Sequence, residues 1–222
     1  MALDQLRPRI TALLDPFVAK LGWVNPNYIS WFSLFIAAIS AWLFATATAD
    51  ASGGMNILIA TILYAFAALC DGLDGQIARK HGKDSAYGDY LDHTIDRIVD
   101  VGIIVAIGIN VSWVSTPHLG YIAGLATLMG SYMGTQAQSV GLGRNYRGFG
   151  RADRMIVTFA GALVASWQAF SGVSDYGEIP FFGVKINALT VVLVITLLGG
   201  VYTFLTRFIS ASKELLSDST AP

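Results

Sequence analysis

The sequence predicts an all-α integral membrane protein with six transmembrane helices and an N-terminal amphipathic helix at the membrane interface. Three observations support this fold class. The chain is 54% hydrophobic and 13% charged, with a mean hydropathy of +0.57, which is too apolar for an ordinary soluble domain of 222 residues. It contains six apolar stretches of roughly 20 residues, the length that crosses a bilayer. The loops between these stretches alternate in charge.

The first 22 residues are predicted to form a helix that lies on the membrane surface. Apolar residues recur there at helical spacing, and Arg7, Arg9, Asp15 and Lys20 lie between them. Pro16 is expected to bend or split this helix, because proline cannot donate the backbone hydrogen bond. There is no early apolar core followed by a small-residue cleavage site, so a cleaved signal peptide is not expected.

The six spans are expected to form one domain over residues 1–222, with the helical bundle at 27–209 and a cytoplasmic tail at 210–222. Glycines four residues apart on the fourth span, Gly120 with Gly124 and Gly130 with Gly134, predict that neighbouring helices approach closely there. The spans are expected near 27–48, 55–79, 88–113, 119–142, 153–172 and 186–209.

Basic residues predict the orientation of the bundle. By the positive-inside rule, both termini and the loops at 80–87 and 143–152 face the cytoplasm of a cell membrane. Lys185 is the one basic residue in the loops on the other side. This distribution explains the basic residues without a nucleic-acid partner. Cys70 is the single cysteine, so no intrachain disulfide and no cysteine-based metal site is expected.

Four aspartates occupy the second and third spans. Asp71 and Asp74 are three residues apart, and Asp92 and Asp96 are four apart, so each pair lies on one helical face. The deeper member of each pair lies about 12–13 Å from the cytoplasmic loop, at 1.5 Å per residue. If the two faces meet, the carboxylates repel one another, and a hard divalent cation would relieve that repulsion. Oxygen ligands select Mg²⁺, Mn²⁺ or Ca²⁺, and two ions could share four carboxylates.

Small residues surround these carboxylates. Gly72, Gly75, Ala78 and Gly88 leave room for a bulky ligand against the backbone. Arg79 lies one turn from Gly75 and suits a phosphate group. Acidic metal ligands, small residues and an arginine together describe a site for a diphosphate.

The same residues carry a family resemblance. Their spacing resembles, at all eight fixed positions, the signature of the CDP-alcohol phosphotransferases: Asp71-x2-Asp74-Gly75-x2-Ala78-Arg79-x8-Gly88-x3-Asp92-x3-Asp96. The Pro26-Asn27-x2-Ser30 segment at the first span is similar to that family's Pro-Asn-x2-Thr stretch, with serine in place of threonine.

The resemblance implies an enzyme of phospholipid biosynthesis that transfers a phosphatidyl-type group from a CDP-lipid to the hydroxyl of a second alcohol and releases CMP. It implies that Asp71, Asp74 and Asp92 hold two divalent ions, Mg²⁺ or Mn²⁺. Asp96 would complete this cluster and act as general base on the acceptor hydroxyl. The family resemblance also implies a homodimer.

The donor residues follow from the same resemblance. Gly75 and Ala78 would make room for the cytidine, Arg79 would contact the diphosphate, and Asn27 is a further candidate for the CDP-donor site. A cation transporter or channel with an acidic intramembrane site is the alternative of another class. It explains the carboxylates but not the glycines, the alanine and the arginine in register with them.

The segment GLGRNYRGFGRADR at 141–154 is the second informative stretch. Its arginines suit either a positive-inside anchor or a pocket for an anionic acceptor. The run from 151 to 154 resembles the phosphatidylinositol-phosphate synthase branch and its archaeal relatives, which implies inositol phosphate as acceptor. Gly134 and Gln136 replace basic residues of that branch's bacterial members, so glycerol phosphate stays second. The candidate acceptor-phosphate ligands are Arg144, Arg147, Arg151, Arg154 and Arg207.

Overall fold

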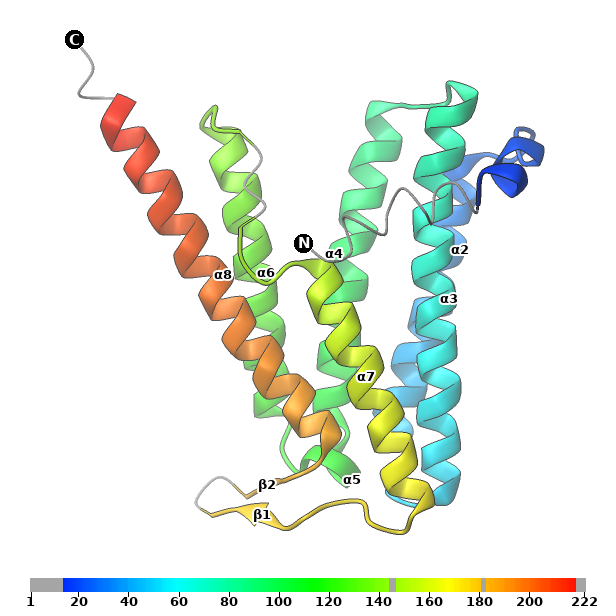
Figure 1. Ribbon diagram of the computed structural model, residues 1–222, viewed down its shortest axis with the longest axis vertical. Helices are drawn as coiled ribbons and strands as arrows, with labels where there is room; N and C mark the ends of the chain where they lie inside the picture. Colours follow the sequence, from blue (N-terminus) through cyan, green and yellow to red (C-terminus); the bar gives the residue numbers. More distant parts are fainter. Residues whose placement is uncertain (1–13, 144–146, 181–182, 219–222) are drawn as a thin grey trace.

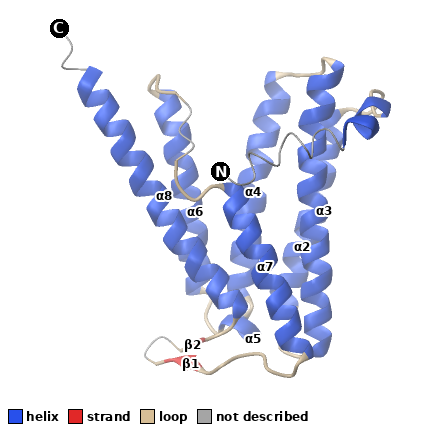
Figure 2. Cartoon of the chain, in the orientation of Figure 1, coloured by secondary structure: helices blue, strands red, loops and turns tan. Residues whose placement is uncertain are grey.

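The computed structural model describes residues 14–143, 147–180 and 183–218, and six long helices make up most of this part of the chain (Figures 1 and 2). Each predicted span corresponds to one of them. Their bounds are α2 (Pro26–Thr46), α3 (Ala51–His81), α4 (Ala86–Ile109), α6 (His118–Ser139), α7 (Arg151–Phe170) and α8 (Ala188–Asp218). The short helix α5 (Val111–Val114) and an antiparallel pair of two-residue strands, β1 (Glu178–Ile179) and β2 (Val184–Lys185), lie in the loops at one end.

The six helices form a ring. Going around it, α3 packs against α2, α2 against α4, α4 against α6, α6 against α8, α8 against α7, and α7 returns to α3. At the α5 end the helices converge, whereas at the opposite end α6 and α8 lean away from α3 and α4 (Figure 1). Helix α7 starts well inside this open end rather than at its rim. The apolar core lies toward the closed end, around Phe44, Ile57, Ile107 and Trp113, which leaves the open end for polar side chains.

Three helices of the described residues, α2, α3 and α8, are long and apolar enough to cross a membrane. The other three long helices carry more polar and charged residues, among them Asp96 and Asp100 on α4 and Arg151 and Arg154 on α7. That all six helices span the bilayer therefore stays a prediction. Its physical basis is that the charged side chains of α4 and α7 turn into the ring rather than toward lipid.

The third predicted span ends earlier than expected. The span expected near 88–113 corresponds to α4, which stops at Ile109, and the separate short helix α5 begins at Val111. Asn110 causes the break. Its side-chain oxygen accepts a hydrogen bond from the Ser112 N–H at 3.1 Å, and its amide donates to the carbonyls of Phe44 and Ala47 at 2.7 and 2.9 Å. The buried asparagine thus caps one helix and ties it to the end of α2.

The predicted close approach of helices at the glycines of α6 is confirmed. A Cβ atom built on Gly120 would lie 2.5 Å from the Gly108 Cα of α4, and one built on Gly130 would lie 3.2 Å from the Gly200 carbonyl oxygen of α8. Helix α6 therefore packs against two neighbours backbone to backbone, which side chains larger than hydrogen would prevent.

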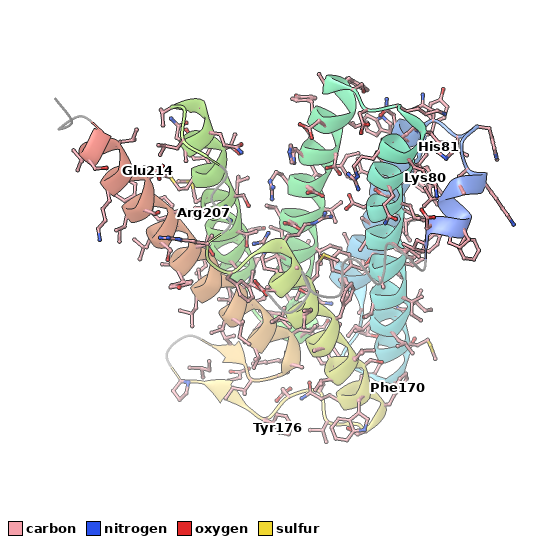
Figure 3. The ribbon with its side chains drawn as sticks, turned by 45° about the horizontal axis from the view of Figure 1, so that its top comes forward. Lys80, His81, Phe170, Tyr176, Arg207 and Glu214 are labelled. Atoms are coloured by element: carbon pink, nitrogen blue, oxygen red, sulfur yellow. The ribbon has the colours of Figure 1, made fainter. Side chains whose placement is uncertain are left out.

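The described end of the N-terminal segment packs against the start of the α3–α4 loop. Residues 14–20 are helical, and Pro16 lies within that helix. Lys80 forms an ion pair with Asp15 at 2.5 Å, and Lys83 Nζ donates to the Gly22 carbonyl at 2.7 Å. Lys80 and the neighbouring His81 lie at this end of α3 (Figure 3). Residues 1–13 of the predicted surface helix lie outside the described residues, so its location at the membrane surface stays a prediction.

The last helix is longer than predicted. Helix α8 continues past the expected end of the span at 209 and reaches Asp218. Most of the segment assigned to a tail, 210–222, is therefore helical up to 218. Leu215 and Leu216 are exposed on this extension.

Candidate active site at the open end of the bundle

Two cavities open between the helices at the end opposite α5. The first has a volume of about 460 Å³ and lies between the start of α2, the last turns of α3 and the start of α4. The predicted donor residues all line it, together with two of the predicted metal ligands. These lining residues are Asn27, Asp74, Gly75, Ala78, Arg79 and Asp92.

Small residues in the first cavity are placed where a side chain would intrude. Arg79 bends back over Gly75, so that a Cβ atom there would lie 3.2 Å from Arg79 Nη1. A Cβ atom on Gly88 would lie 3.4 Å from Asn27 Oδ1. Gly72 differs, because a Cβ atom on it would meet nothing within 4 Å. Gly72 therefore faces open space, and no neighbouring helix in the described part of the chain approaches it closely.

Asp74 is fixed by the first helix. Its side chain is 4% exposed, and its Oδ2 accepts a short hydrogen bond from the hydroxyl of Ser30 on α2. Ser30 Oγ also lies 3.3 Å from the carbonyl oxygen of Pro26. The Pro-Asn-x2-Ser segment thus contacts Asp74 through the hydroxyl of Ser30. This hydrogen bond orients the Asp74 carboxylate.

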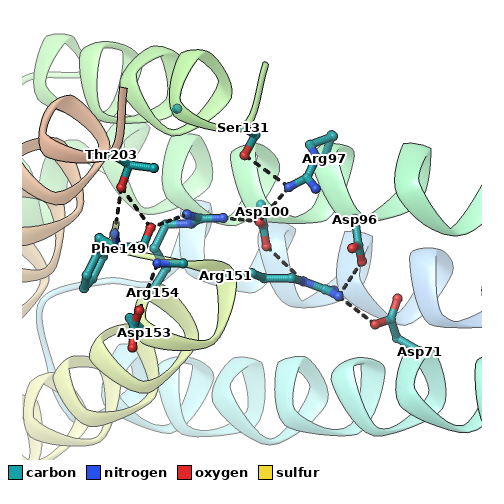
Figure 4. A network of polar contacts seen from close by, with 12 residues as sticks. Asp71, Asp96, Arg97, Asp100, Ser131, Phe149, Arg151, Asp153, Arg154 and Thr203 are labelled. Carbon is teal, nitrogen blue, oxygen red and sulfur yellow. Dashed lines mark hydrogen bonds and ion pairs between the residues drawn. The ribbon is translucent and has the colours of Figure 1, made fainter. Parts of the chain in front are cut away.

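The carboxylates of α3 and α4 meet around an arginine of α7 (Figure 4). Arg151 Nη1 lies 2.7 Å from Asp71 Oδ2 and forms an ion pair with Asp96. Its Nε lies 3.3 Å from Oδ1 of Asp100. Two of the four predicted metal ligands, one from each helix, therefore reach the same guanidinium nitrogen. The sequence placed Arg151 in an acceptor loop and did not predict this contact.

Three side chains of α4, two of them predicted metal ligands, lie close enough together to hold a divalent cation. Ligand atoms of Asp92, His93 and Asp96 lie within 4.8 Å of one another. The buried Oδ1 of Asp96 meets Arg151 but accepts no well-directed hydrogen bond. Carboxylate oxygens in this density suit Mg²⁺ or Mn²⁺. His93 Nε2 also lies 3.8 Å from Asp89 Oδ1.

The second cavity, of about 840 Å³, lies between α4, α6, the start of α7 and α8. Three of the predicted acceptor arginines line it, Arg151, Arg154 and Arg207, and Asp96 lines it too. Arg207 is partly used by the fold, because it donates to the carbonyl oxygens of Gly130 and Arg147 at 2.9 and 3.1 Å. It lies between α8 and α6 (Figure 3).

Two other predicted acceptor residues are not placed in this cavity. Arg147 is exposed and lies outside its described wall, with Nη1 3.5 Å from Ser210 Oγ. Arg144 lies outside the described residues. The loop arginines predicted as one group are thus divided by the fold between the cavity and the surface.

The start of α7 is held deep in the bundle by local contacts. Asp153 caps the helix by accepting a hydrogen bond from the Gly150 N–H at 2.9 Å. The preceding Phe149 donates its N–H to Thr203 Oγ1 of α8 at 2.8 Å, and Arg154 Nη1 donates to the Phe149 carbonyl at 3.2 Å. These contacts place the first turn of α7 beside the carboxylates.

Sequence reasoning missed Arg97 and Asp100. Arg97 lines the second cavity and donates to Ser131 Oγ at 3.1 Å. Asp100 is buried and binds Arg154. A signal was present, because Asp92, Asp96 and Asp100 follow one another at intervals of four residues on one helical face. The family signature ends at Asp96, one turn before Asp100.

Comparisons with known proteins agree with the resemblance stated from the motif. A sequence model described as CDP-alcohol phosphatidyltransferase matches residues 23–202. The archaetidylinositol phosphate synthase of Methanothermobacter thermautotrophicus is 32% identical over 161 residues, which cover 72% of this chain and 77% of the relative.

Two crystal structures of the Mycobacterium tuberculosis phosphatidylinositol phosphate synthase share the fold. The structure with CDP-DAG bound has a TM-score of 0.68 at 22% identity and covers 91% of this chain and 94% of its own. The structure in complex with manganese and citrate has the same TM-score and identity and covers 88% and 87%. The matched segment includes the whole motif from 71 to 96, the first cavity and the arginines of α7. This chain therefore belongs to the CDP-alcohol phosphatidyltransferase family and is a membrane transferase of phosphatidyl-type groups.

Proposed function

We propose that this enzyme transfers the phosphatidyl-type group of a CDP-lipid to a hydroxyl of a phosphorylated polyol and releases CMP, with inositol phosphate as the favoured acceptor and glycerol phosphate as the second. One observation carries the proposal: the two cavities adjoin, and Ala86 and Asp89 line both. The first is bordered by carboxylates and Arg79, as a diphosphate donor requires. The second is bordered by arginines, as an anionic acceptor requires.

The favoured acceptor draws support from a relative. The protein of Methanothermobacter thermautotrophicus is named for the synthesis of archaetidylinositol phosphate. The cavity wall offers four arginines, and the planar donor groups of a guanidinium match a phosphate better than a neutral hydroxyl. Membership of the transferase family also favours this function over the divalent-cation transporter.

The metal ligands of this proposal are Asp71, Asp74, Asp92 and Asp96, which would hold Mg²⁺ or Mn²⁺, in two sites. When bound, the ions would neutralise the charge that develops on the diphosphate as CMP leaves. A structural neighbour was solved with manganese, and the oxygen-rich cluster of this chain suits the same class of ion.

The residues of the chain position the two substrates and move one proton. Arg79 would contact the diphosphate, and Gly75 and Ala78 would leave room for the cytidine beside Asn27. Asp96 would accept the proton of the acceptor hydroxyl. The hydroxyl oxygen would then form the new bond to phosphorus while the bond between phosphorus and the CMP oxygen breaks. Asp96 suits this role because it lines the acceptor cavity and belongs to the carboxylate cluster.

The membrane location follows from the substrates. The tails of a CDP-lipid stay in the bilayer, while the phosphorylated polyol and CMP are soluble in water. We propose that the open end of the bundle faces the cytoplasm, as do both termini, and that the enzyme works as a homodimer in the cell membrane. The basic residues at this end support that orientation.

An acceptor screen tests the proposal. Purified enzyme with a CDP-lipid and Mg²⁺ is expected to release CMP with inositol phosphate, more slowly with glycerol phosphate, and hardly at all with free inositol. A chelator should stop the reaction, and Mg²⁺ or Mn²⁺ should restore it. Faster release with free inositol than with either phosphorylated acceptor would contradict the proposed acceptor class.

A buried hydroxyl provides a test of the metal ligands. Ser30→Ala removes the hydrogen bond to Asp74, and loss of such a supporting contact weakens metal binding about 10–100-fold. The concentration of Mg²⁺ that gives half-maximal CMP release should therefore rise, while Ser30→Thr should keep it near the original value. Ser40→Ala is the matched control, because Ser40 is also buried on α2 and donates across the same helix pair to the Ala60 carbonyl at 2.7 Å. Equal Mg²⁺ requirements for Ser30→Ala and Ser40→Ala would argue against Asp74 as a metal ligand.

A further inference from the structure

One buried aspartate beyond the motif contacts three arginines of the second cavity. Asp100 lies on α4 one turn after Asp96 and is 4% exposed. Its Oδ1 accepts a hydrogen bond from Arg151 Nε at 3.3 Å, and its Oδ2 accepts one from Arg154 Nη2 at 2.5 Å. Arg97 Nη1 lies 3.7 Å from the same Oδ2 (Figure 4). Each carboxylate oxygen is thus directed to a different arginine of α7.

The arginines face the cavity, whereas Asp100 does not. Arg97, Arg151 and Arg154 all belong to the described wall of the second cavity, and Asp100 lies behind them. Helices α4 and α7 are not neighbours in the ring, so these ion pairs reach across the interior of the bundle.

Asp100 supplies the negative charge that balances these arginines. Asp100 is buried beneath three guanidinium groups, and without a counter-charge these like charges would repel one another. A guanidinium is planar and donates in fixed directions. Arg151 is therefore oriented at both ends, by Asp100 at Nε and by Asp71 and Asp96 at Nη1.

We propose that Asp100 is the positioning residue of the acceptor site: it holds Arg151 and Arg154 in the orientation that binds the acceptor's phosphate, and so it sets the preference for a phosphorylated over an unphosphorylated polyol. This inference rests on the proposed function and deepens it. Asp100 acts through the arginines and touches neither substrate.

Steady-state kinetics of two variants test the proposal. Asp100→Asn keeps the shape of the side chain and removes its charge, and one charged hydrogen bond corresponds to roughly a tenfold change in an equilibrium constant or more. The KM for inositol phosphate is expected to rise at least about tenfold, while the KM for the CDP-lipid changes less than about twofold. Asp100→Glu restores the charge and should recover part of the loss. Unchanged acceptor KM in both variants, or an equal rise in both KM values, would overturn the proposal.

A binding measurement separates this inference from the proposed reaction. Inorganic phosphate should raise the Tm of the unmodified full-length protein in detergent, since a ligand of the folded state stabilises it. The Tm increase should be smaller in Asp100→Asn and partly restored in Asp100→Glu, and it should be retained in Asp175→Asn, a matched change in the loop at the closed end. If Asp100→Asn does not fold, Asp100→Glu alone decides, because its longer side chain should still displace the arginines and reduce the increase.

The two failures are distinguishable. Absence of CMP release with any phosphorylated acceptor would refute the proposed function, and the Tm shift by phosphate would still test Asp100. Absence of a phosphate-dependent Tm increase in the unmodified protein, or equal increases in all variants, would refute the role of Asp100 even if the transfer reaction occurs.

Discussion

Asp96→Asn is expected to lower the rate of CMP release by about 10²- to 10⁴-fold, the usual contribution of a general base. Asparagine keeps the shape of the side chain but cannot accept the proton of the acceptor hydroxyl. Much of the CDP-lipid binding should remain, because the first cavity is lined by Asp74, Arg79 and Asp92 rather than by Asp96. The rate is measured by CMP release at saturating substrates, and donor binding by titration with a CDP-lipid.

The control for this variant lies at the other end of the bundle. Asp175 accepts a hydrogen bond from the Gly177 N–H at 3.1 Å in the loop between α7 and β1, and asparagine can accept the same bond. Asp175→Asn should therefore keep the full rate. Turnover close to normal in Asp96→Asn would remove Asp96 from the role of base.

Gly108→Ala is expected to destabilise the fold strongly. A Cβ atom on Gly108 would lie 2.2 Å from the Gly120 Cα, and backbone cannot move aside as a flexible side chain can. Overpacking of this kind costs about 1–3 kcal/mol or more, because α4 and α6 must separate. The measurement is the Tm of the purified protein, which falls by about 2–4 °C for each kcal/mol in chains of this size.

A glycine on the same helix serves as the control. A Cβ atom on Gly102 meets nothing within 4 Å, so Gly102→Ala should leave the Tm unchanged or raise it through the better helix propensity of alanine. Equal Tm values for Gly108→Ala and Gly102→Ala would mean that α4 and α6 do not pack as described. The pair tests the tertiary structure independently of activity.

The positions of the helices and the grouping of the proposed donor residues could be predicted from local patterns. Apolar stretches of span length located the six long helices to within a few residues at most ends, because a helix depends on contacts between residues three and four apart. The spacing of Asp71, Asp74, Asp92 and Asp96 placed carboxylates on two helical faces, and those faces do turn toward one another. The break at Asn110 was not predicted, because it depends on two hydrogen bonds to the end of α2, more than 60 residues away in sequence.

The proposed acceptor arginines come together only through tertiary contacts. In the sequence, Arg147 and Arg151 belong to one basic segment, and either of them is a candidate ligand of an anion. The structure separates them, because among the described residues of this segment Gly150, Arg151 and Arg154 line the second cavity and Arg147 does not. Side chains that meet there come from positions 51, 54 and 80 residues apart, which no local period can anticipate.

The sequence by itself predicted the family and the reaction class, because the motif that carries them lies within 26 consecutive residues. Only the tertiary structure shows that Arg151 contacts Asp71 and Asp96, and that Asp100 forms ion pairs with Arg151 and Arg154. The physical reason is the range of the interactions. Helix periodicity sets which residues share a face, whereas the charge balance of a buried site depends on which distant helices bring their side chains to it.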